Sequence, residues 1–254
     1  MHDQYTVITC SYNTPIVTEC LLRSYYKYHP NTKHNIIIID NSTDNLTASK
    51  LDSYNIPYVR GKDVLPKAPN DDNWWYHPAG LDWAIKQCTT PYCLIVDTDI
   101  IFCKNISLYL RIFSSNDEFV AMGEHISGGQ AQRIKDGKVV NVNDNYILPR
   151  IHPCFMLLDV NFFNKHNLTF NQPNNINLPD NHIYDAGSYL LQKIYELGKK
   201  TIRIEPTDSS YVHCGGLSWV EGVENKLDIY TNTVVPDLAN VNITDKYFSD
   251  ISVY

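Results

Sequence analysis

Two carboxylates one residue apart, Asp97 and Asp99, are the side chains best placed to do chemistry, because they follow a short apolar run that begins at Cys93. The run is rich in β-branched residues, which predicts a buried strand with both faces covered. Alternating side chains of a strand point to opposite faces, so we expect both acids on one face at its carboxyl end. A buried carboxylate is costly without a partner, and Mg²⁺ or Mn²⁺ often joins carboxylates to phosphates. The pattern therefore predicts a metal–diphosphate site centred on Asp99.

An Asp-x-Asp pattern is short, and taken alone it is better explained as a solvated acidic turn. The segments before it favour the metal site, because strands and helices alternate there. We expect strands at Tyr5–Cys10, Asn35–Asp40 and, briefly, residues 56–60, with a helix from Pro15 to about Tyr28 and a short one over 47–53. This alternation predicts an α/β fold with parallel strands, whose carboxyl ends bind ligands.

The pattern is less regular beyond residue 60. Residues 61–73 are expected to form a loop, and residues 128–144 a mobile loop or a hairpin around the turn Lys135-Asp136-Gly137-Lys138. Further helices are expected over residues 81–87, 106–114 and 184–197, and further strands over 118–122, 154–159 and 201–204.

Composition limits the class of protein. The chain has 254 residues, 43% hydrophobic and 19% charged, which suits one large α/β domain or one domain with an appendage. A net charge of −7 argues against nucleic acid or an anionic membrane as a partner. We expect no transmembrane segment, since no apolar run is long enough, and no signal peptide. The seven scattered cysteines, an odd number, suggest reduced thiols and a cytoplasmic location.

Together these segments resemble the GT-A-fold glycosyltransferases, most closely the family 2 type. The resemblance is carried by a strand ending in Ser11-Tyr12-Asn13, a strand ending in Asp40-Asn41-Ser42-Thr43-Asp44, and the segment His77–Ile85 before the Asp-x-Asp strand. It is good from about residue 5 to 101. Beyond that it is looser, and rests on residues 185–187 and 213–219.

This resemblance implies a single GT-A domain with a mostly parallel central sheet flanked by helices. Residues 1–101 would form the nucleotide-sugar-binding half, 102–233 the acceptor-binding half and 234–254 a C-terminal tail. It implies a metal-dependent transfer of a sugar from a nucleotide-diphosphate sugar to a hydroxyl acceptor, a glycan or another molecule, with Mn²⁺ or Mg²⁺ as cofactor.

Polar residues at the strand ends are candidates for nucleotide binding. Asp40 ends a parallel strand, where its carboxylate could accept the imino proton of a base, and Ser11 and Asn13 could hold the base or the ribose. Turn and helix capping explain Ser11 and Asn13 equally well.

The resemblance adds His77 and Gly80 to the nucleotide side, and places Asp97 at the ribose or beside the metal. Asp99 would bind the metal directly. A late histidine often completes the metal shell in such enzymes, and His213, which precedes glycines that allow close backbone approach, is the candidate. A lone histidine is more often structural.

Transfer with inversion needs a base that takes the proton of the acceptor hydroxyl. The resemblance places this carboxylate near the start of a helix after the acceptor loop, where Asp185 fits and Asp180 is the second candidate. Asp185 is equally explained as a charge that complements the helix dipole.

Aromatic residues could stack on a sugar face or on the base. The candidates are Trp74 and Trp75 before the helix at 81–87, and Trp219. Core packing is the simpler explanation for at least one of them.

Two other functions compete with this prediction. A sugar-nucleotide nucleotidyltransferase shares the sheet and the metal, but it usually carries a glycine-rich loop with Arg and Lys after the first strand, and residues 11–15 are not of that kind. A non-catalytic carbohydrate-binding module would not need paired acids after an apolar strand.

Overall fold

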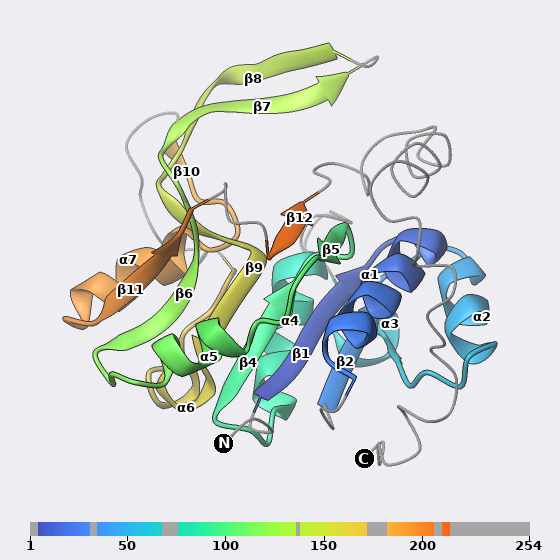
Figure 1. Cartoon of the computed structure of the whole chain (residues 1–254). Helices are drawn as coiled ribbons and strands as arrows, with labels where there is room; N and C mark the ends of the chain where they lie inside the picture. The colour runs from blue at the N-terminus through green and yellow to red at the C-terminus, as the bar shows by residue number, and fades with distance from the viewer. Residues whose placement is uncertain are drawn as a thin grey trace.

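A seven-stranded sheet forms the centre of the molecule (Figure 1). The computed structural model describes residues 5–30, 35–67, 76–135, 138–171, 182–205 and 210–213. The strands lie in the order β11 (Lys200–Ile204), β6 (Phe119–Ile126), β9 (Arg150–Asp159), β4 (Tyr92–Val96), β1 (Tyr5–Ser11), β2 (Asn35–Asp40) and β3 (Val59–Arg60).

The sheet is mostly parallel, as the sequence predicts. Only β9 runs antiparallel to its neighbours, β4 and β6, and the other adjacent strands pair in parallel. From β1 the chain continues to β2 on one side and later returns to β4 on the other. Such a reversal of strand order opens a crevice at the carboxyl ends of the strands, which is where open α/β sheets bind ligands.

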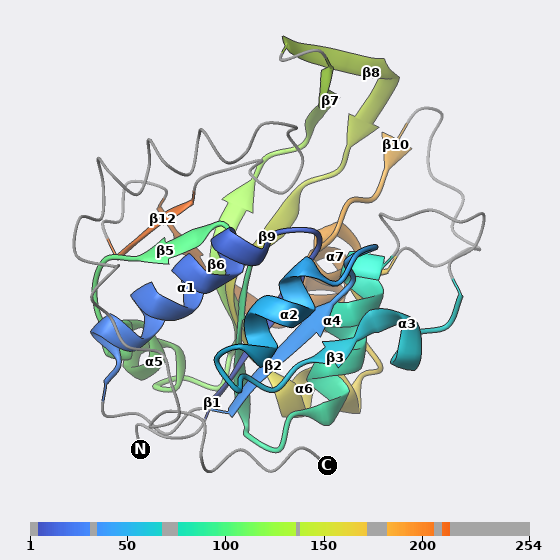
Figure 2. The same ribbon diagram turned by 90° about the vertical axis from the view of Figure 1, so that its right-hand side faces the viewer.

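Helices cover both faces of the sheet (Figure 2). Adjacent residues of a strand serve different faces: Val7 and Leu94 pack into one core, and Ile8 and Ile95 into the other. The first core is covered by α1 (Pro15–Tyr28), α2 (Leu46–Asp52) and α5 (Ser107–Phe113), and the second by α4 (Tyr76–Gln87), α6 (Val160–Lys165) and α7 (Ser188–Glu196).

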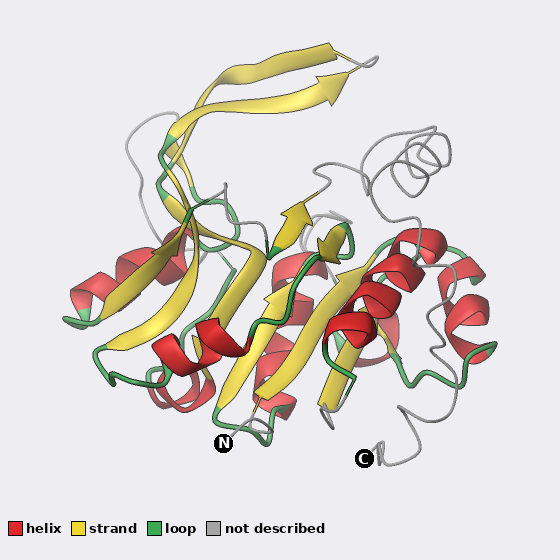
Figure 3. Ribbon diagram, viewed as in Figure 1, coloured by secondary structure: helices red, strands yellow, loops and turns green. Residues whose placement is uncertain are grey.

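Two smaller sheets lie beyond the main one. The first pairs β5 (Ile100–Phe102) with β12 (Tyr211–His213) in antiparallel register. The second contains β7 (Gly129–Lys135), β8 (Lys138–Ile147) and β10 (His182–Ile183). Lys135 pairs with Lys138, so the predicted hairpin is confirmed. In Figures 1 and 3 this hairpin extends away from the sheet, beyond the end of β6.

The prediction about the strand before the acids needs a correction. The strand ends at Val96, and the chain then turns before β5 begins in another sheet. Asp97 and Asp99 therefore lie in a turn, and strand alternation is the wrong reason for expecting them on one face.

Other boundaries also differ from the sequence predictions. The expected loop over residues 61–73 contains a short helix, α3 (Gly61–Val64), and α6 was not predicted although Asp159 caps it by accepting from the amide of Phe162. The helix expected from residue 184 begins at Ser188, so Asp185 precedes it instead of opening it.

Within the described residues, no helix combines the length and apolar character needed to cross a membrane. The six cysteines in the same residues are all free thiols.

Gly187 and Gly198 flank α7, and they allow a matched test of the fold. Both have positive φ, +88° and +69°. A Cβ at Gly187 would lie 2.0 Å from the carbonyl oxygen of Ile151, whereas a Cβ at Gly198 would meet nothing within 4 Å. We expect Gly198→Ala to cost about 1–2 kcal/mol of unfolding free energy from backbone strain alone. Gly187→Ala should cost clearly more, because a backbone carbonyl cannot move aside, and urea unfolding of both variants measures the difference. Equal costs would contradict this account of the β9–α7 contact.

Candidate metal and nucleotide site

A tight turn after β4 presents the two acids. The amide of Asp97 donates to the carbonyl of Cys154 on β9 (2.9 Å), and the amide of Ile100 donates to the carbonyl of Asp97 (3.2 Å). The first bond holds the turn to β9 at the end of the sheet, and the second closes the turn itself. Asp99 is almost fully buried, and Asp97 is partly exposed.

His213 reaches this turn through the pairing of β12 with β5. In that register His213 lies opposite Ile100, next to Asp99, and its Nε2 is 3.3 Å from Oδ1 of Asp99. The strand is anchored by Tyr211, whose ring stacks on Phe155 with centroids 4.1 Å apart. The hydroxyl of Tyr211 also donates to Glu124.

Asp97, Asp99 and His213 form a group that fits a hard divalent cation. One ligand atom from each lies within 4.8 Å of the other two. Two carboxylates and one imidazole suit Mn²⁺ or Mg²⁺, which favour oxygen ligands and accept nitrogen less readily. The structure thus brings together the three residues that the sequence analysis selected as metal ligands.

The carboxylates and imidazoles of this group stabilise each other's charged forms. Burial by itself would raise the pKa of Asp97, but His77 and the nearby His152 and His213 outweigh it and hold that pKa below its usual value. Nε2 of His77 on α4 lies 3.4 Å from Oδ1 of Asp97. Burial would lower the pKa of His213, but Asp99, together with Asp97 and Glu124, raises it. Both acids therefore have imidazole partners inside the site.

Asp40 is enclosed by protein groups. Its side chain has 0% exposure, and Nη1 of Arg60 lies 3.1 Å from its Oδ2. The hydroxyl of Ser11 and the amide of Ser42 donate to its Oδ1, at 3.2 and 3.0 Å. Asp40 thus joins the ends of β1, β2 and β3, and its contact with a base stays a prediction. Arg60 is a partner that no pattern in the sequence indicates.

Ser11 and Asn13 make contacts that match the turn explanation. Ser11 is buried against Asp40. Asn13 has φ of +52°, its amide donates to the hydroxyl of Ser42, and its side-chain oxygen accepts from the amide of Thr43. Its side chain is exposed at the carboxyl edge of the sheet. Asn13 therefore joins the loops after β1 and β2 and does not cap α1.

Gly80 is buried in α4 where the helix meets the sheet. A Cβ there would lie 2.9 Å from Sγ of Cys10 and 3.5 Å from Cγ2 of Ile39. Close helix–sheet packing explains a glycine at this position, and its role in nucleotide binding stays a prediction.

Asp185 lies in the turn before α7, with a side chain that is 43% exposed. Nε of Arg150 is 3.4 Å from its Oδ2, and the amide of Asp185 donates to the hydroxyl of Ser188 (3.2 Å). His152 on β9 is within electrostatic reach of both Asp97 and Asp185, so the two acids flank the same part of the sheet. Trp74, Trp75, Asp180 and Trp219 lie outside the described residues.

Three further residues of β9 line this region and were not selected from the sequence: Arg150, His152 and Cys154. Cys154 is fully buried and His152 is half-buried. The available signal was a histidine and a cysteine two residues apart, a spacing that puts both side chains on one face of a regular strand. In this structure the pairing of β9 with β6 shifts register between residues 151 and 156, and the proximity of the two side chains is seen directly.

Comparisons with solved structures identify the fold. A mannosyltransferase from Pyrobaculum calidifontis, solved with GDP-Man and Mn²⁺, superposes with a TM-score of 0.54 at 16% identity, covering 86% of this chain and 60% of that one. S. aureus TarS gives 0.49 at 15% identity, covering 93% and 41%, and glucosyl-3-phosphoglycerate synthase from Mycobacterium tuberculosis gives 0.38 at 14%, covering 48% and 43%. No protein-family model and no curated protein matches the sequence.

The first of these likenesses shows that the chain has a GT-A fold, as the sequence resemblance implies. The family 2 type stays a prediction. The chain spans less than two thirds of the length of each of these three proteins.

Substitution of Asp99 tests the metal group. Mn²⁺ at 100 times its Kd should stabilise the wild-type protein by about 2.7 kcal/mol, because it binds only the folded state. Asp99→Asn should remove most of this effect, and His213→Ala should reduce it. Thermal unfolding with and without Mn²⁺ measures the difference, with Asp63→Asn, an exposed acid on α3, as the matched control. A full Mn²⁺ response in Asp99→Asn would remove Asp99 from the site.

Proposed function

We propose that this protein is a metal-dependent glycosyltransferase that moves a sugar from a nucleotide-diphosphate sugar to a hydroxyl acceptor. The observation that carries the proposal is the convergence of Asp97, Asp99 and His213 at the carboxyl edge of a GT-A sheet, beside the strand-order reversal between β1 and β4. Ligands bind at that position in open α/β sheets.

In this proposal Asp97, Asp99 and His213 hold Mn²⁺ or Mg²⁺. When bound, the cation supplies Lewis-acid stabilisation of the departing diphosphate, whose leaving oxygen gains negative charge. The same edge carries Asn13 and His77, which are exposed enough to contact a nucleotide.

The donor class has independent support. The mannosyltransferase that shares this fold was solved with GDP-Man and Mn²⁺, a nucleotide sugar and the cation that suits the present donor set. We propose the same class of donor, a nucleotide-diphosphate sugar, for this chain. We also propose a reducing, cytoplasm-like compartment, which suits the free thiols of the six cysteines in the described part of the chain.

For the chemical step we propose a single displacement with inversion, with Asp185 as base. Asp97 and Asp99 are on the metal side and hold the leaving diphosphate, so they are in the wrong place to take the acceptor proton. Asp185 is half-exposed, and its contact with Arg150 orients the carboxylate. Rigid placement matters, since small displacements of a catalytic group are costly in rate. Asp180 remains the second candidate.

Product analysis separates this function from its two competitors. Incubated with nucleotide sugars and Mn²⁺, a glycosyltransferase slowly hydrolyses the donor and releases nucleoside diphosphate. A nucleotidyltransferase, given a nucleoside triphosphate and a sugar 1-phosphate, releases pyrophosphate. A binding module does neither. We expect only nucleoside diphosphate, detected by ³¹P NMR, and its loss in Asp99→Asn. Pyrophosphate formation, or no turnover with any donor of a broad panel, would reject the proposal.

Asp185→Asn tests the base, because it keeps the shape and removes the proton acceptor. Transfer should fall by a factor on the order of 10²–10⁴ while donor binding persists. Glu196→Gln, an exposed acid at the end of α7, is the matched control and should leave the rate unchanged. A product that keeps the anomeric configuration of the donor, seen by NMR, would defeat the inverting mechanism whatever the variant does.

A further inference from the structure

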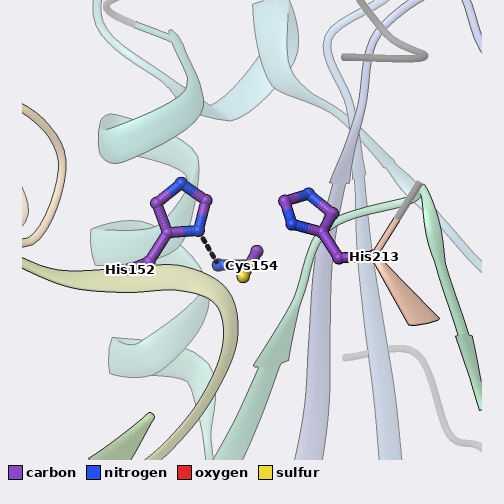
Figure 4. A group of neighbouring side chains, drawn as sticks. All are labelled: His152, Cys154 and His213. Atoms are coloured by element: carbon purple, nitrogen blue, oxygen red, sulfur yellow. Dashed lines mark hydrogen bonds between the residues drawn. The ribbon is translucent and has the colours of Figure 1, made fainter. Parts of the chain in front are cut away.

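A second group of metal-binding side chains adjoins the first and has different chemistry. His152 and Cys154 on β9 face His213 on β12, and one ligand atom from each of the three lies within 4.8 Å of the others. Figure 4 shows the two imidazoles on either side of a gap, with the Cys154 side chain below and between them. The ring centroids of His152 and His213 are 5.6 Å apart.

The donor atoms of this group are two imidazole nitrogens and one sulfur. Cysteine sulfur and histidine nitrogen are typical Zn²⁺ ligands, whereas Mg²⁺ and Mn²⁺ favour oxygen. Three protein ligands also leave one tetrahedral position open, which a water or a neighbouring carboxylate fills. The two groups therefore select cations of different softness, although both include His213.

The surroundings of Cys154 favour a cation. Its side chain has 0% exposure. The carboxylates of Asp97, Glu124 and Asp99 lie within electrostatic reach of it. Those three carboxylates attract a divalent cation, which displaces the thiol proton when it binds.

The second histidine, His152, is held in place by a local contact. The amide of Cys154 donates to its Nδ1 (3.3 Å), which orients the ring beside the sulfur. A nitrogen that accepts this proton is engaged and the other nitrogen carries the ring hydrogen, so binding of a cation replaces this hydrogen bond.

We propose that His152, Cys154 and His213 form a binding site for a thiophilic divalent cation of the Zn²⁺ class, and that this cation competes with the hard cation for His213. The site itself is independent of the proposed function. Its consequence, inhibition of sugar transfer by Zn²⁺, rests on that function.

Cobalt gives a direct optical test, because Co²⁺ enters zinc sites and its bond to a thiolate produces a charge-transfer band in the near ultraviolet. We expect the band in the wild-type protein with one equivalent of Co²⁺, its bleaching by Zn²⁺, and its loss in Cys154→Ser. Cys103→Ser, which alters a partly buried thiol outside the cluster, should keep it. No band in the wild type, or a band that survives Cys154→Ser, overturns the proposal.

His152→Gln provides a second variant in case Cys154→Ser does not fold. Even the loss of an outer-shell partner weakens metal binding by about 10–100-fold, so loss of a direct ligand should cost at least that. Unchanged Co²⁺ affinity in His152→Gln would overturn the proposal. The Zn²⁺ X-ray absorption spectrum of the wild type should show one sulfur at about 2.3 Å.

Competition is measured by the electron paramagnetic resonance signal of free Mn²⁺. Zn²⁺ should release bound Mn²⁺ at a lower concentration from the wild-type protein than from Cys154→Ser, because direct exchange at the two carboxylates does not need the sulfur. Full binding of both cations together would overturn the sharing of His213. If the wild-type protein binds no Mn²⁺, the proposed function fails, and the cobalt band alone still decides whether the Zn²⁺-class site exists.

Discussion

The antiparallel pairing of β12 with β5 is the contact on which the candidate site depends. It brings His213 beside Asp99, residues far apart in the chain, and sets the register that puts His213 opposite Ile100. The pairing is supported from the core, because the ring of Tyr211 stacks on Phe155 of β9. The same strand β9 carries His152 and Cys154, so one local arrangement holds both groups of metal-binding side chains.

Several acidic side chains lie at the carboxyl edge of the sheet. The residue paired with each acid determines whether that acid can bind a metal ion. Asp40 is fully buried against Arg60, whose charge is permanent, so burial of this carboxylate is offset by a fixed ion pair. Asp97 and Asp99 have histidine neighbours instead. An imidazole can share a cation with a carboxylate, whereas a guanidinium repels one. The contrast separates an acid that joins strand ends from acids that suit a metal site.

Local patterns predict much of this fold, and long-range pairing accounts for what they miss. The strands β1, β2 and β4 and the pairing of β7 with β8 follow from apolar runs and turn chemistry. Asp97 and Asp99 were expected together for the wrong reason, since a turn and not strand alternation presents them. The neighbour of Asp99, His213, was selected by resemblance, because nothing local places β12 beside β5. His152 was missed because the strand was expected to begin at Cys154, two residues too late to include it.

Because both groups include His213, the cation that binds depends on the available concentrations of Zn²⁺ and Mn²⁺ as well as on the geometry of the ligands. For a given set of nitrogen, oxygen and sulfur ligands, Zn²⁺ binds more tightly than Mn²⁺. The carboxylates around Cys154 attract any divalent ion, so charge alone does not separate the two groups. Separation comes from donor type: oxygen on the β4–β5 turn, sulfur and nitrogen on β9. Because His213 belongs to both groups, an ion that draws His213 toward Cys154 takes a ligand from the carboxylate pair, and the two occupancies oppose each other without any movement of the sheet.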